Sequence, residues 1–261
     1  MRCSRTFVRL VLFFFLSSVL TPVLTSVMAF GEAGAPGPVI SNENQAMPQA
    51  MVIGFVGGFV KRDARAHSTV QVVEHLRNAH REGVYVQSFA NRDRDQAYRE
   101  ILRHLDGNND GRLSAEEKQN ARIIIFGHSW GASETVTLAR KLERDGIPVL
   151  LTIQVDSVAK VGQNDSVIPA NVGQAINFYQ PDGFVHGRPQ IRAADPAHTQ
   201  ILGNFRYDYK ASAFSCEGYP WFDRILVKAH TEIECDPKVW SQVESLIYSK
   251  LSPEARDTAA R

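Results

Sequence analysis

Net charge, cysteine and internal repetition are all scarce in this sequence, and each shortage removes a class of protein. The 29 lysine and arginine residues nearly balance 28 acidic ones, so the net charge of +1 gives no sign of a nucleic-acid or other polyanionic partner. No segment repeats at a fixed period, which excludes a repeat array. With 44% apolar and 22% charged residues, the 261 residues are enough for one globular domain with a full core. No protein partner is evident.

Cysteine occurs three times, at Cys3, Cys216 and Cys235. No Leu-x-x-Cys pattern surrounds Cys3, so this residue does not indicate a lipoprotein. The other two form an even pair, which in an exported chain favours one disulfide between Cys216 and Cys235. Two unpaired thiols are the alternative.

The N-terminus has the pattern of an export signal. A positively charged start is followed by an apolar run from Leu10 to Phe30, and Val27-Met28-Ala29 offers a small-x-small cleavage site. We therefore expect residues 1–29 to be a signal peptide and the protein to be secreted or periplasmic. The alternative is an uncleaved membrane anchor, because the apolar run is long enough to cross a bilayer.

Residues 51–251 have the pattern of a single α/β domain between a flexible linker at 30–50 and a disordered tail at 252–261. Near-continuous apolar strands alternate with amphipathic helices, which predicts a mainly parallel sheet covered by helices on both faces. The expected strands are 51–56, 84–89, 121–126, 149–155, 172–179 and 224–228, and the expected helices are 69–79, 95–105, 132–143 and a last one from 236.

The most informative stretch is an apolar run that ends in Gly127-His128-Ser129-Trp130-Gly131 and continues as a helical pattern. A Gly-x-Ser-x-Gly sequence between a strand and a helix is the layout of a nucleophile elbow, in which a sharp turn exposes the serine hydroxyl. Ser129 is therefore the candidate nucleophile. We expect His128 to pack the elbow and not to act as a base.

A serine hydroxyl is a poor nucleophile at its free pKa, so it requires a base, an orienting acid and an oxyanion site. His230 is the candidate base, and we expect it to follow a late strand and precede the last helix. Three features, namely the elbow, the Gly57-Gly58-Phe59 turn after the first strand and the late His230, make the chain similar to the α/β-hydrolase superfamily. The catalytic triad of that superfamily follows the order serine, acid, histidine along the sequence. The resemblance covers residues 51–251 and implies a three-layer fold and a serine hydrolase.

The sequence departs from the superfamily pattern at its start and in its insertions. Only a linker precedes residue 51, which implies a reduced sheet without the two N-terminal antiparallel strands of larger members. No long cap insertion is evident between the expected strands. The implied fold is that of small lipase- and cutinase-like members.

The orienting acid has three candidates. Asp156 directly follows the strand at 149–155, and the carboxyl ends of parallel strands are where such sheets place their sites. Asp182, after the next strand, occupies the more usual position in the superfamily, and Asp165 is a third option in a turn. We favour Asp156 because of its position at a strand end and keep Asp182 as the alternative.

The resemblance also implies an oxyanion hole. In the superfamily, one backbone N–H comes from the residue after the nucleophile and one from the loop after the first core strand. These groups correspond to Trp130 and to Gly58 or Phe59. The alternative for the two glycines is a tight turn that has no role in catalysis.

A second motif precedes the elbow. Residues 106–117 match the EF-hand loop D-x-[DN]-x-[DN]-G-x₅-E at every specified position. Calcium is a hard cation that takes roughly six to eight oxygen ligands, and the expected ligands are Asp106, Asn108, Asp110, the carbonyl of Arg112 and Glu117. The sequence holds no second loop of this kind, so we expect a structural Ca²⁺ clamp and not a sensor. A solvated loop that binds no ion is the alternative.

These patterns together predict an exported serine hydrolase that cleaves a carboxylic ester or thioester of a small-molecule or lipid-like substrate through Ser129, His230 and Asp156. The competing prediction is a non-catalytic, calcium-stabilised binding or surface protein that keeps the elbow for packing.

Overall fold

The computed structural model describes residues 48–79, 82–211 and 215–251. The predicted signal peptide at 1–29, most of the predicted linker and the predicted tail at 252–261 lie outside these residues. Ala50, which we expected to end the linker, is the first residue of a strand. Within the described residues, no helix is both long enough and apolar enough to span a membrane.

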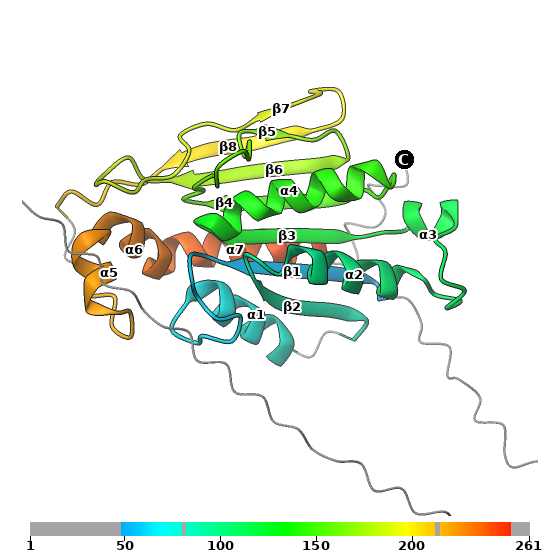
Figure 1. The fold of residues 1–261 in the computed structure, drawn as a ribbon, viewed down its shortest axis with the longest axis horizontal. Helices are drawn as coiled ribbons and strands as arrows, with labels where there is room; N and C mark the ends of the chain where they lie inside the picture. The colour runs from blue at the N-terminus through cyan, green and yellow to red at the C-terminus, as the bar shows by residue number, and fades with distance from the viewer. Residues whose placement is uncertain (1–47, 80–81, 212–214, 252–261) are drawn as a thin grey trace, which may run out of the picture. The chain divides into compact units, whose positions relative to one another are not determined.

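The centre of the fold is a six-stranded sheet in the order β2-β1-β3-β4-β6-β8, with every neighbouring pair parallel (Figure 1). The strand order reverses between β1 and β3, and sheets of this kind bind ligands at the carboxyl ends of the strands beside such a reversal. The strands are β1 (Ala50–Val56), β2 (Val84–Ala90), β3 (Ile123–His128), β4 (Val149–Val155), β6 (Val172–Tyr179) and β8 (Gln200–Arg206).

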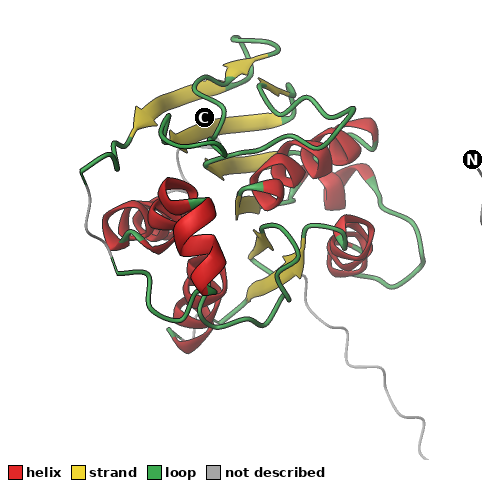
Figure 2. Ribbon diagram, turned by 60° about the vertical axis from the view of Figure 1, so that its left-hand side comes forward, coloured by secondary structure: helices red, strands yellow, loops and turns green. Residues whose placement is uncertain are grey.

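Helices cover both faces of this sheet (Figures 1 and 2). In β3, Ile123 and Ile125 join one buried core, while Ile124 joins the core on the opposite face. Both faces of the strand are therefore apolar, and each fully buried isoleucine contributes roughly 1.5–3 kcal/mol. The predicted fold class is confirmed. The helices on one face are α2 (Arg94–Leu105) and α4 (Trp130–Arg144), and those on the other are α1 (Ser68–Asn78) and α7 (Pro237–Leu251).

One predicted strand is wrong. Residues 224–226 end the helix α5 (Trp221–Leu226), Val227 forms the turn that follows, and Lys228 begins the helix α6 (Lys228–Cys235). Periodicity does not distinguish a strand from a helix over five residues of which only three are apolar. Ile225 and Leu226 in this run are exposed, so they contribute nothing to a buried strand.

The sixth strand of the sheet is instead β8, which we did not predict. It lies at the edge of the sheet, and its residues are half-buried or exposed. Gly203 and polar residues interrupt its apolar pattern, so the hydrophobic signal is weaker than in the central strands. A separate two-stranded parallel ladder is formed by β5 (Val167–Ile168) and β7 (Arg192–Ala193).

A disulfide joins Cys216, in the loop before α5, to Cys235, the last residue of α6. The two Cα atoms are 5.7 Å apart, and the bond closes a segment of 19 positions that carries α5 and α6. Closing a loop of this length stabilises the folded state by about 3 kcal/mol, chiefly through the entropy of the unfolded chain. The bond therefore holds α6 in place at the carboxyl end of the sheet.

Candidate active site

Ser129 lies at the turn between β3 and α4. Its backbone has φ 57° and ψ −125°, a region that residues other than glycine rarely adopt. A Cβ atom on Gly131 would lie 2.2 Å from the carbonyl oxygen of Phe55, and one on Gly127 would lie 2.7 Å from the carbonyl group of Gly131. Both positions therefore accept only glycine, which is the physical reason for the Gly-x-Ser-x-Gly spacing.

His230 lies between Ser129 and Asp156. Its Nε2 atom is 2.8 Å from Ser129 Oγ, and its Nδ1 atom is 2.6 Å from Asp156 Oδ2. Both distances are within hydrogen-bond range, and all three residues are buried. One imidazole therefore links a hydroxyl to a carboxylate, which is the geometry in which a base can take the serine proton.

The local structure around His230 differs from the prediction. We expected this residue after a strand, but it lies in the helix α6. The disulfide at Cys235, the last residue of that helix, fixes the position of α6. The candidate base is thus presented by a clamped helix and not by a loop.

The carboxylate of Asp156 is held by several donors. Its Oδ1 atom accepts the backbone N–H groups of Gln180 and Gly187 at 3.1 and 2.6 Å, and its Oδ2 atom accepts the side-chain amide of Gln180 at 2.8 Å. A Cβ atom on Gly187 would lie 2.2 Å from Asp156 Oδ1, so the loop approaches as closely as only glycine allows. These charge-assisted bonds keep the carboxylate directed toward the imidazole.

The two other acids that we considered are bonded elsewhere. Asp182 accepts the backbone N–H of Tyr209 at 2.9 Å. Asp165 pairs with Arg188 at 2.8 Å. Within the described residues, neither has a contact with the candidate base, so the structure brings Asp156 alone of the three to it.

The turn after β1 lies against the elbow. A Cβ atom on Gly57 would lie 3.0 Å from Ser129 Cβ, and the Val60 N–H donates to the Gly57 carbonyl at 3.2 Å. Gly58 has φ +42°, which favours glycine. The four residues from Gly57 to Val60 therefore form a tight turn directly beside the candidate nucleophile.

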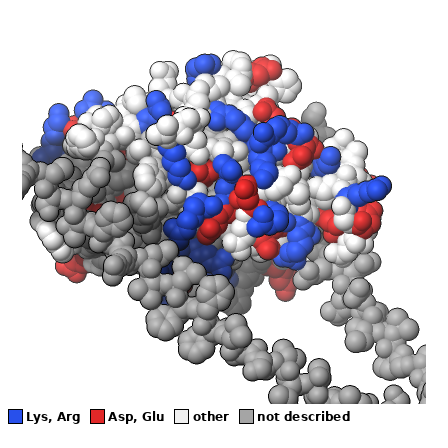
Figure 3. Space-filling model, in the orientation of Figure 1, with Lys and Arg blue, Asp and Glu red and all other residues white. Residues whose placement is uncertain are grey.

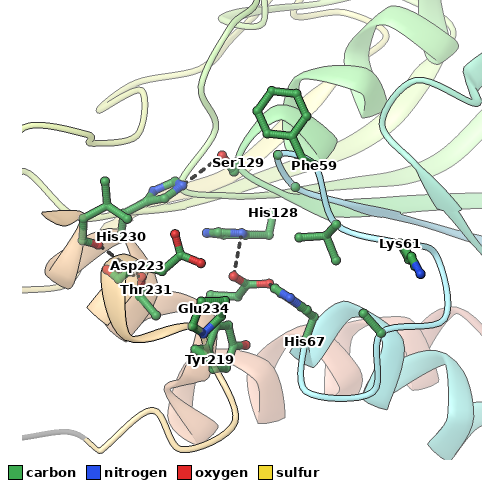
Figure 4. A pocket seen from close by; sticks show the side chains of 16 residues that line it. Phe59, Lys61, His67, His128, Ser129, Tyr219, Asp223, His230, Thr231 and Glu234 are labelled. Carbon is green, nitrogen blue, oxygen red and sulfur yellow. Dashed lines mark hydrogen bonds and ion pairs between the residues drawn. The ribbon is translucent and has the colours of Figure 1, made fainter. Parts of the chain in front are cut away.

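The side chains of Trp130 and Phe59, two of the residues predicted to supply oxyanion donors, are in contact. Trp130 is the first residue of α4, so its N–H is one of the amides that an α-helix leaves unpaired at its start. Its ring meets the Phe59 ring edge to face, with 5.4 Å between centroids. Phe59 is 87% exposed, and its side chain lies beside Ser129 in the pocket (Figure 4).

A buried polar cluster behind the candidate base was not predicted (Figure 4). Glu234 lies one turn after His230 in α6, and its carboxylate is 2.6 Å from His67 Nδ1 and 3.3 Å from His128 Nδ1. The His128 and His230 rings are 4.6 Å apart between centroids. His128 therefore does more than pack the elbow, because it fills the space between Glu234 and the base. The four-residue spacing of His230 and Glu234 was the available signal, since it puts both on one helical face.

The charges of this cluster are divided unevenly. Burial lowers the pKa of His128 to about 4, although the charge of Glu234 acts in the opposite direction, so this ring is neutral at pH 7. Its contact with the Glu234 carboxylate lacks hydrogen-bond geometry. Burial also acts to lower the pKa of His67, but the hydrogen bond and charge of Glu234 outweigh it and raise that pKa. Burial would raise the pKa of Glu234, whereas the neighbouring imidazoles lower it. Of the two imidazoles, His67 is therefore the one whose protonated form Glu234 favours.

A cavity of about 380 Å³ opens beside Ser129 (Figure 4). Phe59 and Val227 contribute apolar lining, and the Glu234 side of the cavity is polar. Asp223 also lines it, and burial together with the charge of Glu234 raises the pKa of this carboxyl group. The volume is that of a pocket for a small molecule or part of a larger one.

Among the described residues, one group of His and acidic side chains brings three ligand atoms within 4.8 Å of one another, and it consists of His128, Asp156 and His230. Asp156 and His230 are already bonded to each other at 2.6 Å. The grouping is therefore accounted for by the hydrogen-bonded site itself.

The loop at 106–117 connects α2 to the short helix α3 (Ala115–Gln119). Its acidic side chains turn onto the backbone of the loop: Asp106 accepts two N–H groups at 3.1 and 2.9 Å, and Asp110 accepts one at 2.8 Å. Glu117, in α3, accepts an N–H from the start of the loop at 2.9 Å. The loop is thus closed end to end by hydrogen bonds from its own backbone to its carboxylates, and among the described residues these carboxylates do not bring three ligand atoms within 4.8 Å of one another. Carboxylate oxygens are nevertheless the hard donors that calcium prefers.

The surface over α2 and α4 carries acids and bases side by side (Figure 3). Lys141 pairs with Asp95 at 2.9 Å across the two helices, and Arg103 pairs with Glu100 at 2.9 Å within α2. Exposed pairs of this kind contribute little stability, roughly 0–1 kcal/mol each.

A scan against protein-family models finds no match, and neither does a search of curated proteins. Solved structures give distant similarities. A thioesterase, RedJ, from prodiginine biosynthesis in Streptomyces coelicolor is 13% identical (76% of this chain, 97% of that chain, TM-score 0.34). An acetyl xylan esterase is 11% identical (78% and 99%, TM-score 0.37), and a cutinase-like protein from Cryptococcus sp. is 12% identical (79% and 97%, TM-score 0.38). TM-scores this low assign no function, which has to come from the side chains of the site.

Proposed function

We propose that this protein is a serine hydrolase that cleaves an ester-like bond, a carboxylic ester or a thioester. The observation that carries the proposal is the continuous contact from Ser129 Oγ through the His230 imidazole to the Asp156 carboxylate, at 2.8 and 2.6 Å. A hydroxyl, a base and a fixed acid in this order are what nucleophilic acyl transfer requires.

In the proposed reaction, Ser129 Oγ attacks the carbonyl carbon while His230 Nε2 takes the hydroxyl proton. Backbone N–H groups of the elbow and the turn after β1 stabilise the negative charge that develops on the carbonyl oxygen. His230 then gives its proton to the leaving alcohol or thiol, which leaves an acyl group on Ser129. Water, deprotonated by His230, hydrolyses this acyl-enzyme and restores the serine.

A fluorophosphonate probe tests the proposal, because it reacts with an activated serine and not with an ordinary hydroxyl. We expect the wild type to be labelled at Ser129 and to hydrolyse a series of nitrophenyl esters, whereas Ser129→Ala should do neither and should fold normally. Ser133→Ala is the matched control, since this serine lies in the first turn of α4, just after Ser129, and donates its hydroxyl to the Trp130 carbonyl at 2.9 Å. Esterase activity that survives in Ser129→Ala would refute the proposal.

The competing function is a binding protein of the same fold that uses the elbow only for packing. Such a protein would give no labelling of the wild type under conditions in which a serine esterase is labelled. The strained backbone of Ser129 argues against it, because strain of this kind persists mainly at functional sites.

We also propose that the loop at 106–117 binds a structural Ca²⁺ through Asp106, Asn108, Asp110, the carbonyl of Arg112 and Glu117, and that the protein is exported. The full match of residues 106–117 to the motif, with its hard oxygen donors, supports calcium binding. The disulfide supports export, because disulfides persist in oxidising compartments. Thermal unfolding with Ca²⁺ and with a chelator tests the clamp, and identical melting temperatures would refute it.

A further inference from the structure

The peptide between Gly58 and Phe59 lies at the centre of the turn from Gly57 to Val60. This peptide joins two backbone positions, of which the first is a glycine that follows another glycine. Glycine leaves both adjacent torsions nearly free, so sequence alone does not determine which way this peptide faces. Its orientation decides whether the Phe59 N–H or the Gly58 carbonyl is presented to an incoming oxyanion.

Asn91 holds this peptide in one orientation. It directly follows β2, whose last residue, Ala90, pairs with Val56 at the end of β1. The Asn91 side-chain amide donates a hydrogen bond to the carbonyl oxygen of Gly58, and Asn91 is buried, with 4% exposure. A buried donor bonded to this oxygen opposes rotation of the peptide, because rotation would leave both groups unpaired.

In a planar trans peptide the carbonyl and the following N–H point in opposite directions. With the Gly58 carbonyl turned to Asn91, the Phe59 N–H is directed to the other side of the turn. Among the described residues, none accepts a hydrogen bond from this N–H or from that of Gly58, so the orientation of the peptide is what distinguishes the two donors. The neighbouring Gly57 lies against the elbow, since a Cβ atom at this position would be 3.0 Å from Ser129 Cβ.

We infer that Asn91 is a positioning residue that makes the Phe59 N–H, and not that of Gly58, the second oxyanion donor beside Trp130. The inference rests on the proposed function. It decides between the two donors that the sequence left open, and it assigns a role to a residue that carries no catalytic motif.

Asn91 is itself anchored to the elbow helix. Lys160 Nζ donates to the Asn91 backbone carbonyl at 3.0 Å and to Glu134 Oε1 at 2.7 Å. Glu134 lies in α4 with 2% exposure, so its charge needs this partner. One network therefore connects the turn to α4, the helix that begins at Trp130, and ties together the two sources of oxyanion donors.

The first test removes the hold on the peptide. We expect Asn91→Ala to lower kcat by roughly 10²–10³-fold, the loss typical for one oxyanion donor, with KM changed little. Binding of a boronic acid that mimics the tetrahedral intermediate should weaken by a similar factor. Asn171→Ala is the control, because the Asn171 side-chain amide also donates to backbone carbonyls, at 3.0 and 2.9 Å. Asn171 lies beside Val149, the first residue of β4, and therefore at the edge of the sheet away from Ser129. This control variant should lower the melting temperature and leave kcat and boronic acid binding unchanged.

The second test separates the two donors. Phe59→Pro removes the N–H, whereas Phe59→Ala keeps it, so only the proline variant should lose kcat and boronic acid affinity to the extent of Asn91→Ala. Provided that the wild type is active, an unchanged kcat in Asn91→Ala, or equal kcat values in Phe59→Pro and Phe59→Ala, would overturn the inference. A wild type that is not labelled at Ser129 would overturn the proposed function and this inference with it.

Discussion

The buried cluster behind Ser129 and the acidic loop at 106–117 are both rich in polar groups, but their contacts span very different lengths of chain. In the loop, the hydrogen bonds of Asp106, Asp110 and Glu117 join residues two to ten positions apart. In the pocket, the contact of Ser129 with His230 spans 101 positions and that of His67 with Glu234 spans 167.

The two regions also differ in their exposure to solvent. The loop residues are largely exposed, so their groups remain hydrated and each contact contributes little free energy. The residues of the cluster are buried, and a buried polar group that loses its partner costs about 1–3 kcal/mol or more when charged. A change in the cluster should therefore alter both stability and chemistry, whereas a change in the loop should alter stability alone.

The largest effect should come from Asp156, the acid of the proposed triad. We expect Asp156→Asn to lower kcat by roughly 10⁴-fold, because an amide presents an N–H to His230 Nδ1 and favours the wrong tautomer. Asp182→Asn should leave kcat nearly unchanged and lower only the stability, since Asp182 accepts the Tyr209 N–H at 2.9 Å. Ester hydrolysis and thermal unfolding of both variants measure the contrast. Equal losses of kcat would contradict the assignment of Asp156.

An intermediate effect should appear in the acid dependence of stability. The pKa of His128 is about 4 in the folded protein and 6.5 ordinarily, so between these values the unfolded chain takes up a proton that the folded protein does not. The free energy of unfolding should therefore fall as pH falls from 6.5 to 4, by about 3 kcal/mol from this residue.

Urea unfolding between pH 4 and 7.5 measures this dependence. His128→Gln should lose less stability than the wild type over the same range, whereas the exposed His198→Gln should follow the wild type. Parallel curves for the wild type and His128→Gln would show that His128 is not a buried neutral imidazole.

The smallest effect should come from the loop. Calcium at a hundred times its dissociation constant stabilises a folded protein by about 2.7 kcal/mol, and we expect Glu117→Gln to lose most of that gain. Glu116→Gln should keep it, because the motif leaves this exposed position unspecified. Melting temperatures with and without Ca²⁺ measure both. The kcat of each variant should equal that of the wild type, and a loss in Glu117→Gln would mean that the loop is coupled to the pocket.

The local parts of the candidate site could be predicted from the sequence. The elbow at Ser129 occupies five consecutive residues, and its glycines are required by contacts within and beside those residues. Asp156 could be placed because the carboxyl ends of parallel strands meet at one edge. The central strands were predicted for a related reason, since they are apolar on both faces.

The long-range parts could not be predicted. His67 precedes α1 and Glu234 lies in α6, and no spacing along the chain connects them. Because we expected a strand at 224–228, we did not predict the helix α6, on one face of which His230 and Glu234 both lie. Asn91 has no sequence signal, because its role depends on the pairing of β1 with β2.

The helix α6 gives the site a sequence motif. His230 and Glu234 are four positions apart and face the same pocket, and Cys235 fastens the end of the helix immediately afterwards. Inserting or deleting one residue between them would rotate Glu234 by about 100° around the helix axis and carry it away from His67. Distant chains that share this site should therefore keep the interval His-x-x-x-Glu-Cys, even where overall identity no longer identifies them.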